Sequence, residues 1–374
     1  MTPAKPAKTP IALIYWGRLG AGAALMHQIS SALAEDERFE VYASPSLRSE
    51  LAVDAAGVHL LPIETFSGWA SLAAGTLMLP VRVNRLVRQL SAAGVKAIVT
   101  IMPHVWGRAL QRAAARAGMK TLLIVHDAEP HLGERRPLFD WLVTREVRAC
   151  TRIVTFSDHV ADRLIARGDA TEERLGRLYH PIFHFTNGAA LAAHPAQPFR
   201  LLFFGRILPY KGVPILLDAF ARLRAAGVDC TLRVVGRGEI DSPPSLMSQP
   251  GLSIETGWVA PDAIGGILAS ADAVVLPYLE ASQSGVIAAA YGAGLPVVAT
   301  PVGGLIEQIS DGETGTLANA ATADALADAI RRLIETPDLY DLCRKGVAQY
   351  AAAHAPRNFA ATLGDTILAT ITER

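Results

Sequence analysis

The chain has few cysteines, little charge and no excess of either sign. It carries three cysteines in 374 residues, and no two of them form a C-x-x-C pair. This usage argues against a disulfide framework or a zinc site and is typical of a reducing cytosol. Lysine plus arginine number 35, as do aspartate plus glutamate, so the formal net charge is zero. Nucleic acid is therefore not an expected partner, because neutralising its phosphates requires a basic excess.

The chain also has no long unbroken hydrophobic run. The first ten residues hold three prolines, and the apolar run over 11–16 is too short for the core of an export signal. The longest stretch without charge, 281–306, could cross a bilayer by length, but it contains five glycines and two prolines. That punctuation favours a buried strand–loop–helix–strand region. We therefore expect a cytoplasmic protein.

Short apolar runs alternate with helical patterns along most of the chain. Residues 11–16, 121–125 and 201–204 are typical of buried strands, and the apolar residues of 213–223 recur at helical spacing. Strands that alternate with helices predict right-handed βαβ units and parallel sheets. The pattern breaks over 180–198, where prolines and an Asn-Gly pair indicate a linker.

The break predicts two doubly wound α/β domains of similar size. We expect an N-terminal domain over 1–182, a linker over 183–198 and a C-terminal domain over 199–356. A last helix over 357–374 is expected to pack back on the N-terminal domain. Ligands of such sheets bind at the carboxyl ends of the strands, so the chemistry is sought in the loops that follow strands.

The loop over 203–214 reads F-F-G-R-I-L-P-Y-K-G-V-P and joins an expected strand to an expected helix. It carries Arg206 and Lys211 just before the helix begins. Helix N-termini favour anions, and two cations there would complete a site for a diphosphate. The same residues also fit a basic loop that faces solvent, and their spacing alone leaves both interpretations open.

A second loop follows the expected strand 273–276 and opens the next helix. Its small residues predict that the backbone amides of Ser284, Gly285 and Val286 are free to cradle a phosphate. A later strand ends in a glycine pair followed by Glu307. Tight turns of an α/β sheet would explain either feature alone. Both features, however, fall in one domain, and each follows a strand.

These motifs resemble glycosyltransferase family 4. They are G-R-x4-K-G, P-Y-x-E-A-S-Q-S-G, A-G-x-P-V-V-A-T and V-G-G-x-x-E followed by D-G-x-x-G, in order over 199–320. A looser resemblance in the first half rests on the glycine loop after the first strand and on His126-Asp127 after the strand 121–125. The resemblance implies the GT-B fold, in which two doubly wound Rossmann-like domains face each other across a cleft.

The resemblance also implies a retaining transferase that moves a sugar from a nucleotide diphosphate sugar to a hydroxyl acceptor. Arg206 and Lys211 would bind the diphosphate and stabilise the departing nucleotide. His126 would hydrogen-bond the donor sugar near the reacting centre, and Glu280 would contact the same sugar. The further expected contacts are Gly20, Ser284, Gly285, Val286 and Glu307 for the nucleotide diphosphate, and Asp127 and Gln283 for the acceptor or sugar.

Enzymes of this type typically need no catalytic metal and no cofactor beyond the donor. The run from His126 to His131 contains Asp127 and Glu129, but its spacing matches no familiar set of metal ligands. We therefore expect no metal. The expected partners are a nucleotide-sugar donor and a saccharide or lipid-linked saccharide acceptor, in polysaccharide or glycolipid assembly.

One departure from the family pattern concerns the ribose. Many members carry a second glutamate, which would fall at Ala288 or Ala289 depending on the register. Glu307 could bind the ribose instead, or simply cap the helix that follows it. The departure keeps two alternatives open: a GT-B nucleotide-sugar epimerase, and a non-catalytic protein that binds sugar nucleotides.

The stretch over 67–90 indicates an amphipathic helix. Residues 67–81 are apolar and uncharged, and Arg82, Arg85 and Arg88 follow. Basic amphipathic helices can lie on anionic lipid, which would place the protein at the inner face of the membrane and suit a lipid-linked acceptor. The same pattern also fits an ordinary surface helix with a solvated face.

Overall fold

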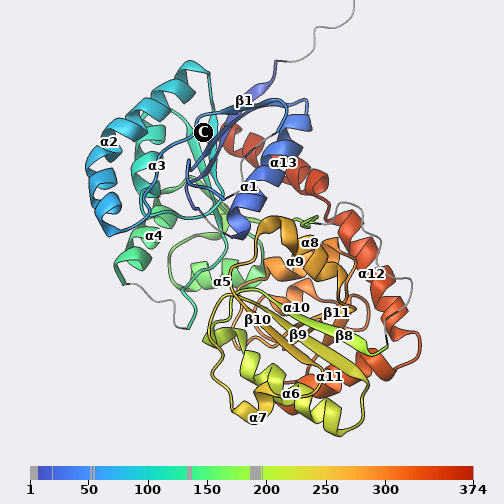
Figure 1. Ribbon diagram of the computed structural model, residues 1–374. Coiled ribbons are helices and arrows are strands. Elements are labelled where there is room, and N and C mark those ends of the chain that lie inside the picture. The colour runs from blue at the N-terminus through green and yellow to red at the C-terminus, as the bar shows by residue number, and fades with distance from the viewer. Residues whose placement is uncertain are drawn as a thin grey trace, which may run out of the picture. The chain divides into compact units, whose positions relative to one another are not determined.

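The computed structural model describes residues 7–18, 20–50, 53, 55–132, 137–185, 195 and 197–373. It divides into two compact units (Figure 1). The first comprises Met1–Glu129, Arg136–Tyr179 and Pro356–Arg374, and the second comprises Pro130–Arg135 and His180–Ala355. The short segment after Glu129 thus belongs to the second unit, although the chain on both sides of it belongs to the first.

The first unit is built on a parallel sheet with the strand order β3-β2-β1-β4-β5-β6-β7. Its central strands are buried on both faces, and this explains their continuous apolar runs. The strands are β1 (Thr9–Tyr15), β2 (Phe39–Pro45), β3 (Val58–Leu60), β4 (Ala97–Thr100), β5 (Lys120–Val125), β6 (Arg152–Thr155) and β7 (Leu175–Arg177).

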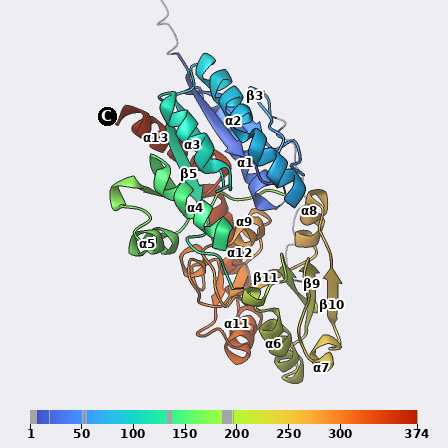
Figure 2. The same cartoon turned by 90° about the vertical axis from the view of Figure 1, so that its left-hand side faces the viewer.

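Helices cover both faces of this sheet. α2 (Trp69–Ala92) and α3 (Gly107–Arg116) pack on one face through a core that includes Ile14 of β1 and Ile98 of β4 (Figure 2). Gly75 lets α2 approach α3, because a Cβ there would lie 2.7 Å from the Trp106 ring. The helices that complete the unit are α1 (Ala21–Glu35), α4 (Pro137–Ala149), α5 (Asp158–Ala166) and α13 (Pro356–Thr372), the last of which packs against α1.

The second unit repeats the plan with the strand order β10-β9-β8-β11-β12-β13. Its strands are β8 (Phe199–Phe204), β9 (Cys230–Gly236), β10 (Leu252–Thr256), β11 (Ala273–Leu276), β12 (Val297–Ala299) and β13 (Gly315–Leu317). Its helices are α6 (Val213–Ala225), α7 (Pro244–Met247), α8 (Pro261–Ala269), α9 (Gly285–Gly292), α10 (Leu305–Gln308), α11 (Ala323–Glu335) and α12 (Leu339–Ala353). Within it, α6 packs against α11, and α9 against α12.

The two sheets confirm the predicted fold class of doubly wound parallel α/β domains. In each sheet the strand order reverses beside the first strand of the unit, at β1 and β4 in one and at β8 and β11 in the other. In doubly wound sheets the loops that leave the strands on either side of such a reversal diverge to opposite faces, and ligands bind at the carboxyl edge between them. Arg206 and Glu280 follow β8 and β11, and Gly20 follows β1.

Candidate functional site

The loop after β8 is held against the end of β11 at a glycine whose backbone leaves no room for a side chain. Gly212 has a φ of 65° and precedes α6, and a Cβ there would lie 1.8 Å from the carbonyl oxygen of Pro277. A second tie runs from the Leu279 amide, which donates to the Tyr210 carbonyl at 2.7 Å. The sequence therefore folds the two motif-bearing loops of the second unit onto each other.

The two cations of this loop are positioned by aromatic side chains. The Lys211 ammonium lies 3.6 Å from the centroid of the Tyr278 ring and 4.9 Å from that of Tyr210, a cation–π arrangement that fixes its charge at the start of α6. The Arg206 guanidinium is exposed and lies 3.5 Å from the Tyr210 hydroxyl. Both charges thus stand where a helix N-terminus already favours an anion.

The loop after β11 differs in one respect from the expectation of three free amides. Ser284 caps α9, and its hydroxyl accepts the Val286 amide at 3.3 Å. The Ser284 amide donates to Oε1 of Gln308 at 2.7 Å. Among the described residues only the Gly285 amide of the three has no acceptor, because side chains satisfy the other two. Their phosphate contacts stay a prediction.

Gln308 is a residue that the sequence analysis missed. It lies on the one-turn helix α10, beside the exposed Glu307, and its side chain reaches back 24 positions to the loop after β11. The Gly304 amide adds a bond of 3.1 Å to the Ala281 carbonyl. The glycine-pair turn after β12 therefore positions the loop at Ser284. No local sequence pattern predicts this contact, because the two segments are distant in sequence.

Two buried polar atoms near these loops lack a hydrogen-bond partner among the described residues. They are Oε1 of Gln283 and the hydroxyl of Tyr278. Buried polar groups are nearly always satisfied, so an orphan in such a loop is a candidate contact for substrate or water. Gln283, expected to contact acceptor or sugar, fits such a contact. That role stays a prediction.

Glu280 is exposed and faces a segment that comes from the loop after β5. Its Oε2 accepts the Leu132 amide at 3.4 Å and lies 3.7 Å from Nδ1 of His131. The His131 ring stacks on Tyr210, with centroids 4.4 Å apart and planes 19° from parallel. His131 therefore belongs beside the cationic loop, a role that the sequence analysis, which weighed it only as a metal ligand, did not assign.

Neither of the two positions at which the second glutamate would fall is accessible at the surface. Ala288 and Ala289 are buried in α9, and the Ala288 carbonyl accepts the Phe183 amide at 3.2 Å. A carboxylate placed at either buried position would lose its hydration. This helix therefore offers no acidic side chain to a ribose.

In the first unit, His126 follows β5 and is buried. Its Nε2 lies 3.0 Å from the Ile101 carbonyl, which can only accept, so Nε2 carries the proton. The ring meets Phe156 edge-on at 5.0 Å. Burial lowers the pKa of His126, against the opposing effects of Asp127 and of the Ile101 hydrogen bond, so the imidazole is neutral at neutral pH. Asp127 itself is exposed.

Gly20 caps α1 with a φ of 89°, and its amide donates to Oε1 of Glu50 at 2.5 Å. The other oxygen of Glu50 is buried without a partner among the described residues. Burial and the Glu50 charge raise the pKa of Tyr15 to about 12. The amide expected to approach phosphate is thus held by a carboxylate, which a phosphate would have to displace.

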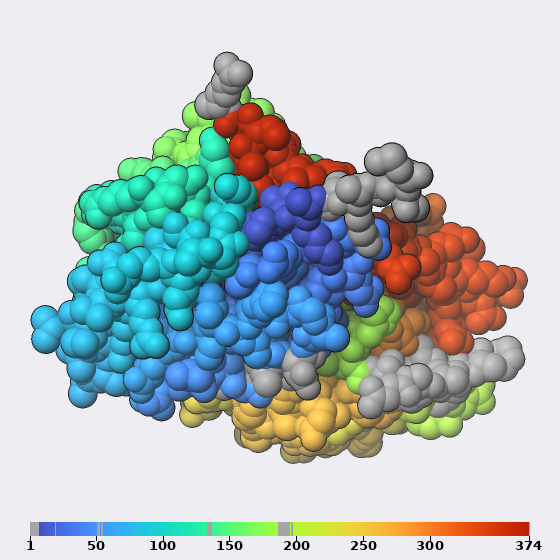
Figure 3. Space-filling view, turned by 90° about the horizontal axis from the view of Figure 1, so that it is seen from above, coloured from blue at the N-terminus to red at the C-terminus, as the bar shows by residue number. Residues whose placement is uncertain are grey.

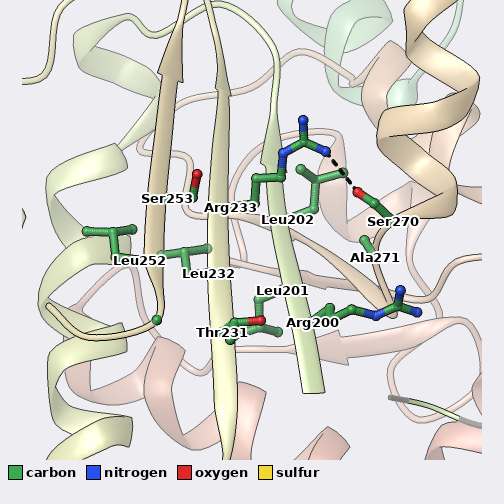
Figure 4. Close-up of a pocket in the computed structure, with 11 residues that line it drawn as sticks. Arg200, Leu201, Leu202, Thr231, Leu232, Arg233, Leu252, Ser253, Ser270 and Ala271 are labelled. Carbon is green, nitrogen blue, oxygen red and sulfur yellow. Dashed lines mark hydrogen bonds between the residues drawn. The ribbon is translucent and has the colours of Figure 1, made fainter. Parts of the chain in front are cut away.

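A groove of about 400 Å³ runs along the amino-terminal halves of β8, β9 and β10, away from these loops (Figure 4). Two arginines line it, but each is paired with a carboxylate that offsets its charge. Arg200 donates to both oxygens of Asp272, at 3.1 and 2.8 Å, and Arg233 donates to Glu255, at 2.7 and 2.8 Å. The groove is therefore unsuited to a diphosphate. No three potential metal ligands gather anywhere in the described part of the chain.

Residues 198–336 match the glycosyl transferases group 1 family. The matched segment lies within the second unit. D-inositol 3-phosphate glycosyltransferase of Arthrobacter sp. (strain FB24) is 32% identical over 227 residues, which are 56% of this chain and 53% of that protein. Alpha-D-kanosaminyltransferase of Streptomyces kanamyceticus is 26% identical over 230 residues, which are 58% and 60% of the two chains. The chain thus spans about half the length of the curated relatives it matches.

Solved structures show the same fold along nearly the whole chain. Sucrose-phosphate synthase of Thermosynechococcus elongatus aligns with a TM-score of 0.77 over 97% of this chain and 99% of that one, at 17% identity. HepE of Anabaena, in complex with UDP and glucose, aligns with a TM-score of 0.70 over 96% and 100%, also at 17% identity. The chain has the GT-B fold, as its motifs predict.

Proposed function

We propose that the chain is a retaining glycosyltransferase that moves a sugar from a nucleotide diphosphate sugar to a hydroxyl acceptor. The observation that carries the proposal is the pair Arg206 and Lys211, fixed by Tyr210 and Tyr278 at the start of α6 and folded against the loop after β11. It lies in the segment that matches the family. Relatives named for sugar transfer support it.

The chemistry that this arrangement serves is the departure of the nucleoside diphosphate. Negative charge develops on the leaving phosphate oxygen as the glycosidic bond breaks, and two fixed cations stabilise that charge without reorganising. The helix dipole of α6 acts in the same direction. Neutral His126, protonated on Nε2, would act toward the sugar as a hydrogen-bond group rather than as a cation.

The partners follow from the same proposal. We infer a nucleoside diphosphate donor, with UDP the first to test because the Anabaena relative was solved with it. For the acceptor we propose a saccharide or lipid-linked saccharide hydroxyl, in polysaccharide or glycolipid assembly on the cytoplasmic side of the membrane. Among the described residues, no helix is both long and apolar enough to cross a bilayer.

The test is calorimetric titration with UDP, GDP, ADP, dTDP and CMP, using the unmodified chain and two variants. Arg206→Ala and Lys211→Ala should each weaken binding of the preferred diphosphate by about 10- to 100-fold, since a charge-assisted hydrogen bond contributes about 1.5–3 kcal/mol. Arg331→Ala is the matched control, because Arg331 is an exposed arginine of α11 that pairs with Asp328, away from these loops. Unchanged affinity in both variants would refute the diphosphate site.

A second candidate function, binding without catalysis, is favoured by the buried alanines at the position of the second glutamate. It predicts nucleotide binding with no turnover. Incubating the chain with the sugar form of the preferred nucleotide and a panel of saccharide and lipid-linked acceptors separates the two. Any glycosylated product excludes the binding function.

A further inference from the structure

The outer face of α2 is more apolar than an ordinary surface helix. Trp69, Leu77 and Val81 lie eight and four residues apart along the helix, with exposed fractions of 76%, 82% and 59%. The opposite face of the helix, with Val83 and Leu86, packs on the sheet. Single exposed apolar residues are ordinary, but three large ones along one helix form an apolar patch, and such a patch on a folded protein marks an interaction surface.

The N-terminal turns of α4 extend this patch. Leu138 and Trp141 are exposed by 64% and 51%. The rings of Trp69 and Phe139 meet edge-on at 6.2 Å, so the start of α4 lies beside the start of α2. Tryptophan is the residue best suited to a boundary between apolar and polar surroundings, because its ring is large and carries one donor.

The charge of this layer is one-sided. α2, α3 and α4 together hold eight arginines and two carboxylates, in a chain whose total charge is zero. One of the two carboxylates, Glu146, is buried. Arg82 pairs with Glu64 and Arg148 with Asp169. The exposed arginines of α2 and α3 are Arg85, Arg88, Arg112 and Arg116, and Arg85 stands four residues after Val81.

We propose that the surface of α2, α3 and α4 docks on an anionic lipid bilayer. The apolar side chains would enter the boundary between headgroups and acyl chains, and the arginines would meet the lipid phosphates. Figure 3 shows the cyan atoms of α2 and the teal atoms of α3 side by side at the left of the view. A second copy of the chain fits less well, because a two-fold contact would set arginine against arginine.

The surface also has a direction relative to the sheet. Trp69 and Leu138 stand in the first turns of helices that follow the strands β3 and β5. The first turn of such a helix lies at the carboxyl edge of the sheet, the edge that also carries His126. If the proposed function holds, docking would bring a lipid-linked acceptor to that edge. The docking itself needs no catalytic activity and is tested without it.

The experiment is flotation of the full chain with vesicles. The unmodified chain should float with vesicles of phosphatidylglycerol and phosphatidylcholine in equal parts, and not with phosphatidylcholine alone. Binding should weaken as salt is raised, because screening shortens the reach of the arginines. Failure to float with the anionic vesicles, or equal binding to both kinds, would overturn the proposal.

Three double variants identify the surface. Arg85→Gln with Arg88→Gln should lower partitioning by about fivefold for each arginine. Leu77→Ser with Val81→Ser should lower it by roughly tenfold for each side chain. Ile306→Ser with Leu342→Ser removes two apolar side chains of equal exposure, 53%, from the second unit and should change nothing. Equal losses in all three variants would overturn the assignment. So would a dimer of the unmodified chain that only the Leu77/Val81 variant dissociates.

Discussion

Glu146 of α4 is a buried carboxyl whose titration should limit the stability of the first unit at high pH. It is fully buried, and Oε2 accepts the His104 amide at 2.8 Å. Oε1 has no partner among the described residues, and it lies where a Cβ on Gly107 would be 1.8 Å away. Burial raises the pKa of Glu146 to about 8, although the His104 N–H opposes this.

The sign and size of the effect follow from linkage. Between pH 4.5 and about 8 the folded chain keeps a proton on Glu146 that the unfolded chain has lost, so the free energy of unfolding falls as pH rises. The loss is complete above the folded pKa. The difference between the two pKa values corresponds to about 5 kcal/mol, an upper figure if the buried site relaxes on ionisation.

Glu146→Gln tests this, because the amide is nearly isosteric with the protonated acid and does not titrate. The variant should match the unmodified chain within about 1 kcal/mol near pH 5 and exceed it by several kcal/mol near pH 9. Urea unfolding followed by tryptophan fluorescence reports mainly on the first unit, which contains Glu146, because four of the five tryptophans belong to it. Glu35→Gln, at an exposed pair with Arg357, is the control. A stability difference that does not change with pH would refute the reasoning.

Two further predictions concern the loops of the candidate site. His126→Ala should lower the rate of sugar transfer by roughly a hundredfold and leave the affinity for nucleoside diphosphate unchanged, and a full rate would remove His126 from the mechanism. Gly212→Ala should destabilise the second unit by about 2 kcal/mol or more in thermal unfolding, because its φ is 65° and a Cβ would strike a backbone carbonyl. Gly266→Ala, in open space on α8, should be neutral or stabilising, and equal losses in the two variants would contradict the steric argument.

The strands that the sequence predicts are those with an unbroken apolar run. Residues 11–16, 121–125 and 201–204 correspond to β1, β5 and β8, because burial on both faces demands an unbroken apolar run. The strands toward the edges, such as β3 and β10, were not predicted. They are short and partly exposed, so their composition does not separate them from loops.

For the candidate site, local signals predict where the chain turns and where charge gathers. Arg206 and Lys211 lie at the start of α6, where the order strand, loop, helix placed them. The side chains that contact these groups come from distant parts of the chain, so no local sequence pattern predicts them. The cation–π contact of Lys211 with Tyr278 and the hydrogen bond from the Ser284 amide to Gln308 are examples. Each exists only after two strands of the same sheet have paired.

The same distinction explains why a glycine-rich loop is weak evidence for a phosphate site. Small residues ensure only that backbone amides are accessible, and a nearby side chain can still accept their hydrogen bonds. Glu50 accepts a hydrogen bond from the Gly20 amide, and Gln308 accepts one from the Ser284 amide. The two cases differ in chemistry, because Glu50 is an anion that a phosphate would replace charge for charge, whereas Gln308 is neutral and braces the loop. The Gly20 amide is therefore open only to a ligand that displaces a carboxylate, whereas the Ser284 amide is committed to holding its own loop.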